Sequence, residues 1–152
     1  MRVWKLAALL MVGLAGNPVA AQTSAPDEAA VTAVVDAFHA ALKSGNSAAA
    51  MRLLAPDVLL IEVGAIETRT EYEKNHLPAD IEFEKTVSNV HKPYRVTVAG
   101  TTAWAVTTSD TKGVFQNRAI DAVGVELMVL SHEPAGWQIR AVHWSARRQQ
   151  PQ

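Results

Sequence analysis

The segment from Ala119 to His132 constrains the fold most, because it has a β-strand pattern with two apolar faces. Neither face should meet bulk water, so the strand needs cover on both sides. Helices can cover one face, and a second copy of the sheet most simply covers the other. We therefore expect a homodimer that associates through the sheet. The two faces consist of Ile120, Ala122, Gly124, Glu126, Met128 and Leu130, and of Asp121, Val123, Val125, Leu127 and Val129.

Helical patterns come early in the sequence and strand patterns come late. Pro78 should end or kink the third helix, and the turn at 133–136 should join the last two strands. This order predicts an α+β fold rather than a parallel doubly wound sheet. Helices are expected at about 27–43, 48–54 and 69–76, and strands at about 58–63, 87–98, 103–109, 119–132 and 137–146.

The first 21 residues have the pattern of a cleaved secretory signal peptide. Arg2 and Lys5 precede an apolar run of eleven residues from Leu6 to Gly16, and small residues lead to Ala21. A membrane span needs roughly 20 residues, so an uncleaved anchor is the weaker alternative. We expect a linker at 22–26, one domain at 27–147 and a disordered tail at 148–152, in the periplasm or outside the cell.

Composition excludes several classes of function. The chain has no cysteine, which excludes thiol catalysis, thiolate metal sites and an N-terminal lipid anchor on cysteine. Without Arg2 and Lys5, 12 of the 14 basic residues remain, and the 15 acidic residues then give a formal charge of about −3. No basic run or aromatic–basic interleaving indicates a nucleic-acid partner. We also expect no membrane contact after signal cleavage, and no cofactor, since no phosphate-binding glycine loop is present.

The turn at 133–136 predicts a register that brings an acid and an imidazole together. If the loop is even, Glu133 faces Gly136 and Glu126 faces His143, with Cβ atoms about 5 Å apart. The pair would then be catalytic, an acid and a base inside an apolar cavity. The alternative is a structural hydrogen bond in which the two buried polar groups satisfy each other. A one-residue bulge would break the pairing.

Two stretches of the chain have a familiar order and spacing: the connection with Gly45-Asn46, Leu53-Leu54 and Ala55-Pro56-Asp57, and the last strand at 136–145. Together they resemble the nuclear-transport-factor-two-like superfamily. The superfamily includes SnoaL-like polyketide cyclases, steroid delta-isomerases and limonene epoxide hydrolases. The resemblance covers about residues 27–147. It implies a cystatin-like α+β roll, a cone-shaped curved antiparallel sheet wrapped on three N-terminal helices, with a pocket at the wide end and often a dimer.

The resemblance does not extend to a mechanism. Steroid isomerases use a tyrosine and two aspartates in the pocket, whereas the first helix here offers Phe38 and His39 and no tyrosine. The Asp-Arg-Asp arrangement of limonene epoxide hydrolases has no counterpart in this sequence either. The resemblance therefore implies a fold and a pocket only.

Five further residues are candidates for the pocket wall: Glu62, Tyr72, His76, Asp80 and Tyr94. Tyr72, His76 and Asp80 follow one another at intervals of four, which aligns side chains on a regular helix. A tyrosine in an apolar site stabilises an oxyanion or, more commonly, only packs. Glu62 is either a pocket carboxylate or a strand-end residue in water. No partner is evident for three histidines, His39, His91 and His132.

These observations predict a small-molecule pocket protein with acid–base chemistry of isomerase, cyclase or hydrolase type on a small apolar ligand. One alternative is a non-catalytic ligand-binding or dimerisation module. The other is a metal-binding protein that uses His76, Asp80, Glu126 and His143 as ligands. The competing interpretation of His76 and Asp80 is purely structural: a histidine at the end of one helix and an aspartate that caps the start of the next.

Overall fold

The computed structural model describes residues 25–149 of the 152-residue chain. The predicted signal peptide and the last three residues lie outside the described part. The helices are α1 (Ala25–Ser44), α2 (Ser47–Leu53), α3 (Arg69–Asn75) and α4 (Leu77–Thr86). The strands are β1 (Leu54–Glu62), β2 (Ala65–Thr68), β3 (Val87–His91), β4 (Arg95–Ala99), β5 (Thr102–Phe115), β6 (Arg118–Glu133) and β7 (Gly136–Arg148).

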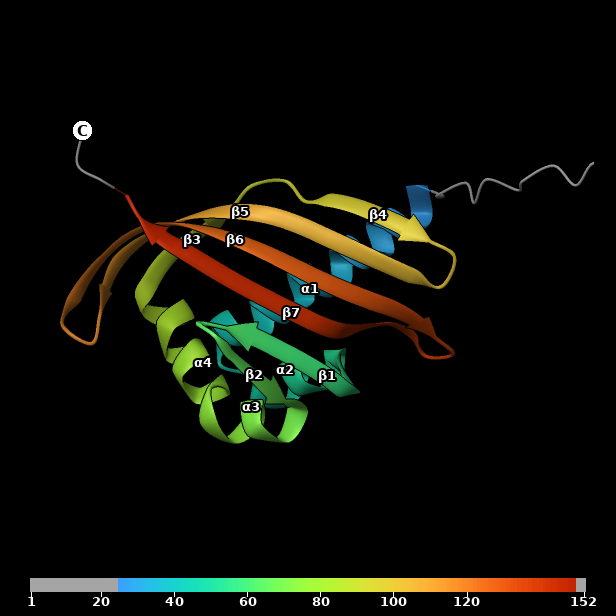
Figure 1. Ribbon diagram of the computed structural model, residues 1–152, viewed down its shortest axis with the longest axis horizontal. Coiled ribbons are helices and arrows are strands. Elements are labelled where there is room, and N and C mark those ends of the chain that lie inside the picture. The colour runs from blue at the N-terminus through green and yellow to red at the C-terminus, as the bar shows by residue number, and fades with distance from the viewer. Residues whose placement is uncertain (1–24, 150–152) are drawn as a thin grey trace, which may run out of the picture.

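The strands form one curved sheet in the order β2-β1-β7-β6-β5-β3, with β4 also paired to β5. Figure 1 shows the long strands β5, β6 and β7 bending across the helices, which all lie on one side. The predicted α+β roll is confirmed. The sheet is not purely antiparallel, however, because β1 runs parallel to β7. The sequence pattern also did not predict the short strand β2.

Local signals explain where the helices begin and end. The Asn46 side chain accepts a hydrogen bond from the backbone of Ala49 at the start of α2. Thr68 and Glu71 form a reciprocal capping box at the start of α3. Pro78 stands in the first turn of α4, where its missing N–H costs nothing. The proline therefore opens a fourth helix instead of kinking the third.

The strand predicted at 87–98 is two strands, β3 and β4, and both pair with β5. Pro93 lies between them and has no backbone N–H to donate to a neighbouring strand. Tyr94 therefore lies in the connection rather than within an alternating strand. At the C-terminus, β7 continues to Arg148, and the backbone N–H of Gln149 donates to the backbone carbonyl of Asp121. The tail predicted at 148–152 therefore begins inside the sheet.

The predicted pairing of Glu126 with His143 is wrong. The turn at 133–136 has the expected register, with Glu133 opposite Gly136. The register then shifts by one residue between Val129 and Leu130, and beyond this bulge Glu126 lies opposite Trp144. A one-residue shift moves every later side chain to the other face. His143 is consequently exposed on the outer face, whereas Glu126 is buried on the inner one.

Arg140 is the residue that the bulge accommodates. Leu130 pairs with Ile139 and Val129 with Ala141, so Arg140 has no partner across the β6–β7 ladder. Its guanidinium instead binds the carboxylates of Asp57 and Glu133, and its Nε donates to the Ser131 hydroxyl at 2.6 Å. These contacts give the extra residue a fixed position.

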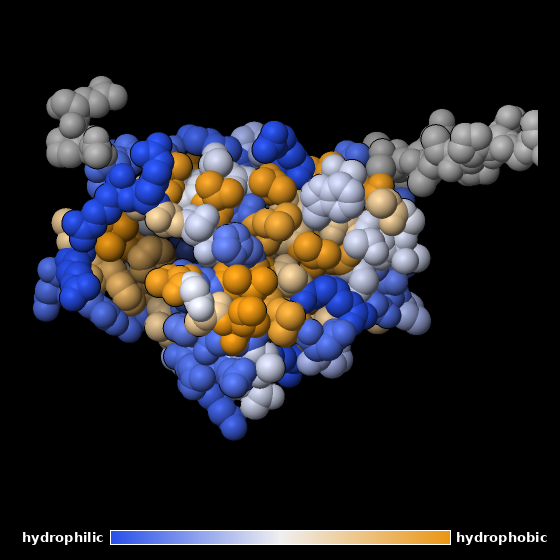
Figure 2. Space-filling model, viewed as in Figure 1, coloured by the Kyte–Doolittle hydropathy of each residue, from blue (hydrophilic) through white to orange (hydrophobic). Residues whose placement is uncertain are grey.

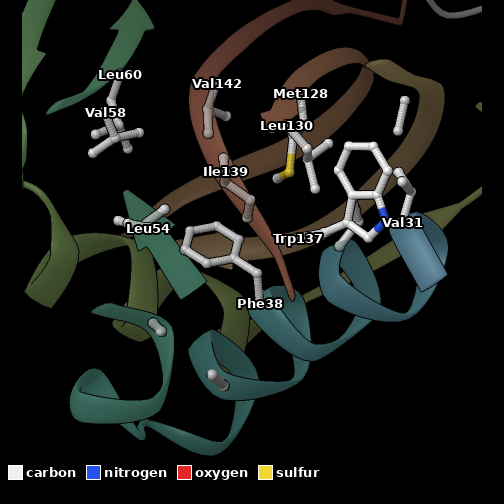
Figure 3. Close-up of a cluster of buried hydrophobic side chains, with 14 of the residues drawn as sticks. Val31, Phe38, Leu54, Val58, Leu60, Met128, Leu130, Trp137, Ile139 and Val142 are labelled. Atoms are coloured by element: carbon white, nitrogen blue, oxygen red, sulfur yellow. The ribbon is translucent and has the colours of Figure 1, made fainter. Parts of the chain in front are cut away.

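The core lies between α1 and the inner face of the sheet. Phe38 of α1 is fully buried and points towards Leu54 and Ile139 (Figure 3). Each such side chain contributes about 1.5–3 kcal/mol through burial. Along β6 the inner-facing residues change from large to small: Leu130 and Met128 fill the core, whereas Gly124 and Ala122 leave space. The same strand thus builds both a packed end and an open end.

The outer face of the sheet carries exposed apolar side chains. Leu59, Trp104 and Val125 are 43%, 39% and 44% exposed. Figure 2 shows apolar residues gathered across this face over the long strands. Within residues 25–149, no helix has the length and apolar character required to cross a bilayer.

Candidate functional site

A cavity of about 310 Å³ occupies the open end of the sheet. It forms where the inner face of β6 carries small residues, so helices α1 and α4 do not close completely on the sheet. A hollow with apolar walls is visible on the side of the β5–β6 hairpin and α4 (Figure 2). The apolar part of the wall includes Leu42, Phe83, Ile120, Ala122, Gly124 and Ala146.

The polar part of the wall is rich in ionisable groups. It contains the carboxylates Glu62, Asp80, Glu84 and Glu126 and the imidazoles His39 and His91. None of the described residues that line the cavity is a lysine or an arginine. The wall therefore presents acids and imidazoles, without a fixed cation that would favour an anionic ligand.

Glu126 is buried in the wall with two partners. His39 Nε2 from α1 lies 3.0 Å from its Oε2, and the Trp144 indole of β7 donates to the same oxygen at 2.7 Å. Burial by itself would raise the pKa of Glu126. The hydrogen bonds from His39 and Trp144 outweigh it and hold the pKa below its usual value. Glu126 is therefore an ionised group at neutral pH.

His39 and His91, for which the sequence shows no partner, both join this site. Their rings meet edge to face with centroids 4.2 Å apart, and His91 Nδ1 lies 3.1 Å from the Tyr94 hydroxyl. Burial, with a smaller effect of His39, lowers the pKa of His91. Helical spacing could have identified His39, because Val35, Phe38, His39 and Leu42 follow the inward-facing pattern of α1.

Asp80 forms a second polar centre together with Tyr72. The fully buried Tyr72 hydroxyl donates to Asp80 Oδ2 at 2.9 Å. Burial raises the pKa of Asp80 to about 6, with the nearby charge of Glu62 acting in the same direction and the Tyr72 hydrogen bond opposing them. Burial and Asp80 likewise raise the pKa of Tyr72. Tyr72 is not part of the cavity wall, so it orients Asp80 from behind.

Glu62, at the end of β1, lies in the cavity wall rather than in water. Burial raises the pKa of this carboxyl group above its usual range. His76, in contrast, is exposed and pairs with Glu67, whose hydrogen bond raises the pKa of the imidazole. The four-residue spacing did not align His76 with Asp80, because His76 precedes α4 and Asp80 lies within its first turn.

The four residues of the metal-binding alternative, His76, Asp80, Glu126 and His143, do not come together. Asp80 and Glu126 line the cavity, but His76 pairs with Glu67 on the surface and His143 lies on the opposite face of the sheet. A different set does meet. One possible ligand atom each from His39, His91 and Glu126 lies within 4.8 Å of the other two.

Comparisons with known proteins agree with this architecture. Residues 31–148 match the SnoaL-like domain family. A structure from Shewanella frigidimarina NCIMB 400, described as a putative ketosteroid isomerase, is 36% identical, covers 76% of this chain and 94% of its own, and has a TM-score of 0.73.

Two more distant structures show the same fold. One, from Streptomyces avermitilis, is described as a putative dehydratase from the NTF2-like family; it is 18% identical over 82% of this chain and 98% of its own, with a TM-score of 0.70. An NTF2-like protein with a cystatin-like fold from Novosphingobium aromaticivorans is 19% identical, covers 78% of this chain and 80% of its own, and has a TM-score of 0.64. No curated protein matches the sequence. The match over residues 31–148 shows that the chain belongs to the SnoaL-like domain family.

Proposed function

We propose that this protein catalyses proton transfer on a small, mostly apolar molecule bound in the cavity. The observation that carries the proposal is Asp80, a cavity-lining carboxyl group whose pKa is raised to about 6 and whose orientation is held by Tyr72. A general base works best when its pKa lies near the working pH, and burial next to another acid produces such a value.

Asp80 and Glu62, the two carboxyl groups with raised pKa values, suit opposite roles. Asp80 would remove a proton from the carbon next to a carbonyl group, and Glu62, in its protonated form, would donate to the carbonyl oxygen as the enol forms. Asp80 then returns the proton either to a different carbon, which isomerises the substrate, or to a departing β-hydroxyl group, which leaves as water. In both cases the enol returns its proton to Glu62. Glu126 is not proposed as the base, because two hydrogen-bond donors already hold its ionised form.

The charge and size of the cavity define the substrate class. About 310 Å³ is at the small end of ligand pockets. Because no lysine or arginine lies among the described wall residues, a carboxylate or phosphate group on the substrate would lack a counter-charge. We infer an uncharged carbonyl compound. The ketosteroid isomerase and dehydratase descriptions of two structural relatives are compatible with such chemistry.

The proposal predicts that the protein exchanges α-protons of small apolar ketones with deuterium from D₂O. Mass spectrometry of a ketone panel measures this without knowledge of the product. Asp80→Asn should reduce exchange at least about 100-fold, the usual contribution of a general base. The rate in the unmodified protein should rise as the pH approaches about 6, because Asp80 must lose its proton to act, and it should fall at higher pH as Glu62 loses the proton that it must donate.

Glu82→Gln is the matched control, since Glu82 is an exposed acid on the same helix. It should leave exchange unchanged. Exchange that persists in Asp80→Asn would refute the role of Asp80. Ketones that bind without exchanging protons would instead favour a non-catalytic binding module.

We further propose that two copies associate through the outer face of the sheet, where Leu59, Trp104 and Val125 are exposed. Leu127, in the middle of this face, tests the association. Leu127→Lys places a charge in the proposed interface and should convert dimers to monomers in sedimentation equilibrium. Ala48→Lys, an exposed position on the helical side, should leave the dimer intact. A monomeric unmodified protein would contradict the proposal.

We also propose that the chain is exported to the periplasm or beyond and loses its first 21 residues. The pattern of charges, apolar run and small residues before Gln22 supports this. Intact-mass measurement of protein from the native host should give an N-terminus at Gln22. A full-length chain beginning at Met1 would contradict cleavage.

A further inference from the structure

We propose that His39, His91 and Glu126 bind one divalent transition-metal ion. The three residues come from separate elements, α1, β3 and β6, and converge on one part of the cavity wall. One nitrogen or oxygen atom of each lies within 4.8 Å of those of the other two. This site differs from the proposed proton-transfer site at Asp80 and Glu62, and it does not depend on it.

The spacing of the donor atoms is close to that of a metal site. His39 Nε2 lies 3.0 and 3.1 Å from the two oxygens of Glu126. Two ligands of a tetrahedral zinc ion, each about 2.0–2.1 Å from the metal, are about 3.3 Å apart. A ring nitrogen of His91 lies within 4.8 Å of the ligand atoms of His39 and Glu126. A small side-chain adjustment would therefore bring it to bonding distance of the same ion.

Outer partners hold two of the three side chains in suitable orientations. Trp144 donates to Oε2 of Glu126, which leaves Oε1 as a ligand. Tyr94 contacts Nδ1 of His91, which leaves Nε2 as a ligand. Metal-binding histidines and carboxylates typically have such a second hydrogen bond, since it fixes the tautomer and the direction of the ring.

His39 supplies an independent observation. Its Nδ1 is buried and has no hydrogen-bond partner, the only such side-chain atom among the described residues. Buried polar atoms are almost always satisfied in native proteins. The spacing of the donor atoms assigns Nε2 of His39 to the ion, so Nδ1 would need a separate polar partner.

The ligand types determine the kind of ion. Two imidazoles and one carboxylate suit zinc, ferrous iron and similar ions, whereas calcium and magnesium prefer oxygen ligands alone. The remaining coordination position would face the cavity, where water or a ligand oxygen could occupy it.

Titration calorimetry with Zn²⁺ tests the site on the whole chain after removal of bound metal with a chelator. We expect one Zn²⁺ per chain. His91→Ala and Glu126→Gln should each weaken binding at least about 100-fold, and Tyr94→Phe about 10-fold. Glu126→Gln keeps the size of the side chain and an acceptor for Trp144, so it guards against simple unfolding. Circular dichroism checks the fold of every variant.

His132→Ala is the matched control, because His132 is exposed and meets the Trp137 ring edge to face, away from the cavity wall. It should bind Zn²⁺ like the unmodified protein, and so should Asp80→Asn. Retained zinc in Asp80→Asn separates this site from the proton-transfer proposal. No zinc binding by the unmodified protein, or equal binding by folded His91→Ala, would overturn the inference.

Discussion

The ionised Glu126 side chain on the buried face of β6 is the constraint on which the site depends. A buried charge is tolerated only when it is paired and hydrogen-bonded. His39 of α1 and Trp144 of β7 supply those bonds, so the helix and the strand must both lie in defined positions against β6. Removing one partner of such a group typically costs about 3–5 kcal/mol. The carboxylate thus couples the position of α1 to the register of the sheet.

The bulge at Arg140 decides which β7 residue meets Glu126. Without it, His143 would lie opposite the carboxylate, and Trp144 would point to the outer face. With it, the indole N–H reaches Glu126, and the Trp144 ring stacks on Phe38 of the core at a centroid distance of 6.5 Å. One extra residue therefore joins the core to the cavity wall.

Local patterns predicted much of the fold. The Asn46 and Thr68 caps, the turn at 133–136 and the inward face of β6 follow from nearest neighbours in the sequence. The bulge could not be predicted, because it depends on Asp57, which is 83 residues from Arg140 and contacts it only in the folded chain. The parallel pairing of β1 with β7 is equally non-local.

The candidate site was predicted only in part, for a similar reason. Glu62, Asp80 and Glu126 stand out as acids in apolar surroundings, and all three line the cavity. The partners of Glu126 and Asp80 come from other elements: His39 lies 87 residues before Glu126, and Tyr72 belongs to the helix before α4. Spacing along one element identifies a residue that faces inward, but it does not identify the residue that it meets.

The proposed chemistry depends most directly on the protonation of Asp80, because it requires a carboxyl group that titrates near neutral pH. Carbon-13 NMR of labelled aspartate carboxyl groups, followed from pH 3 to pH 9, measures that value in the whole protein. The account predicts a midpoint for Asp80 of about 6, assigned by its loss in Asp80→Asn. A midpoint near 3.9, the value of an unperturbed aspartate, would contradict it.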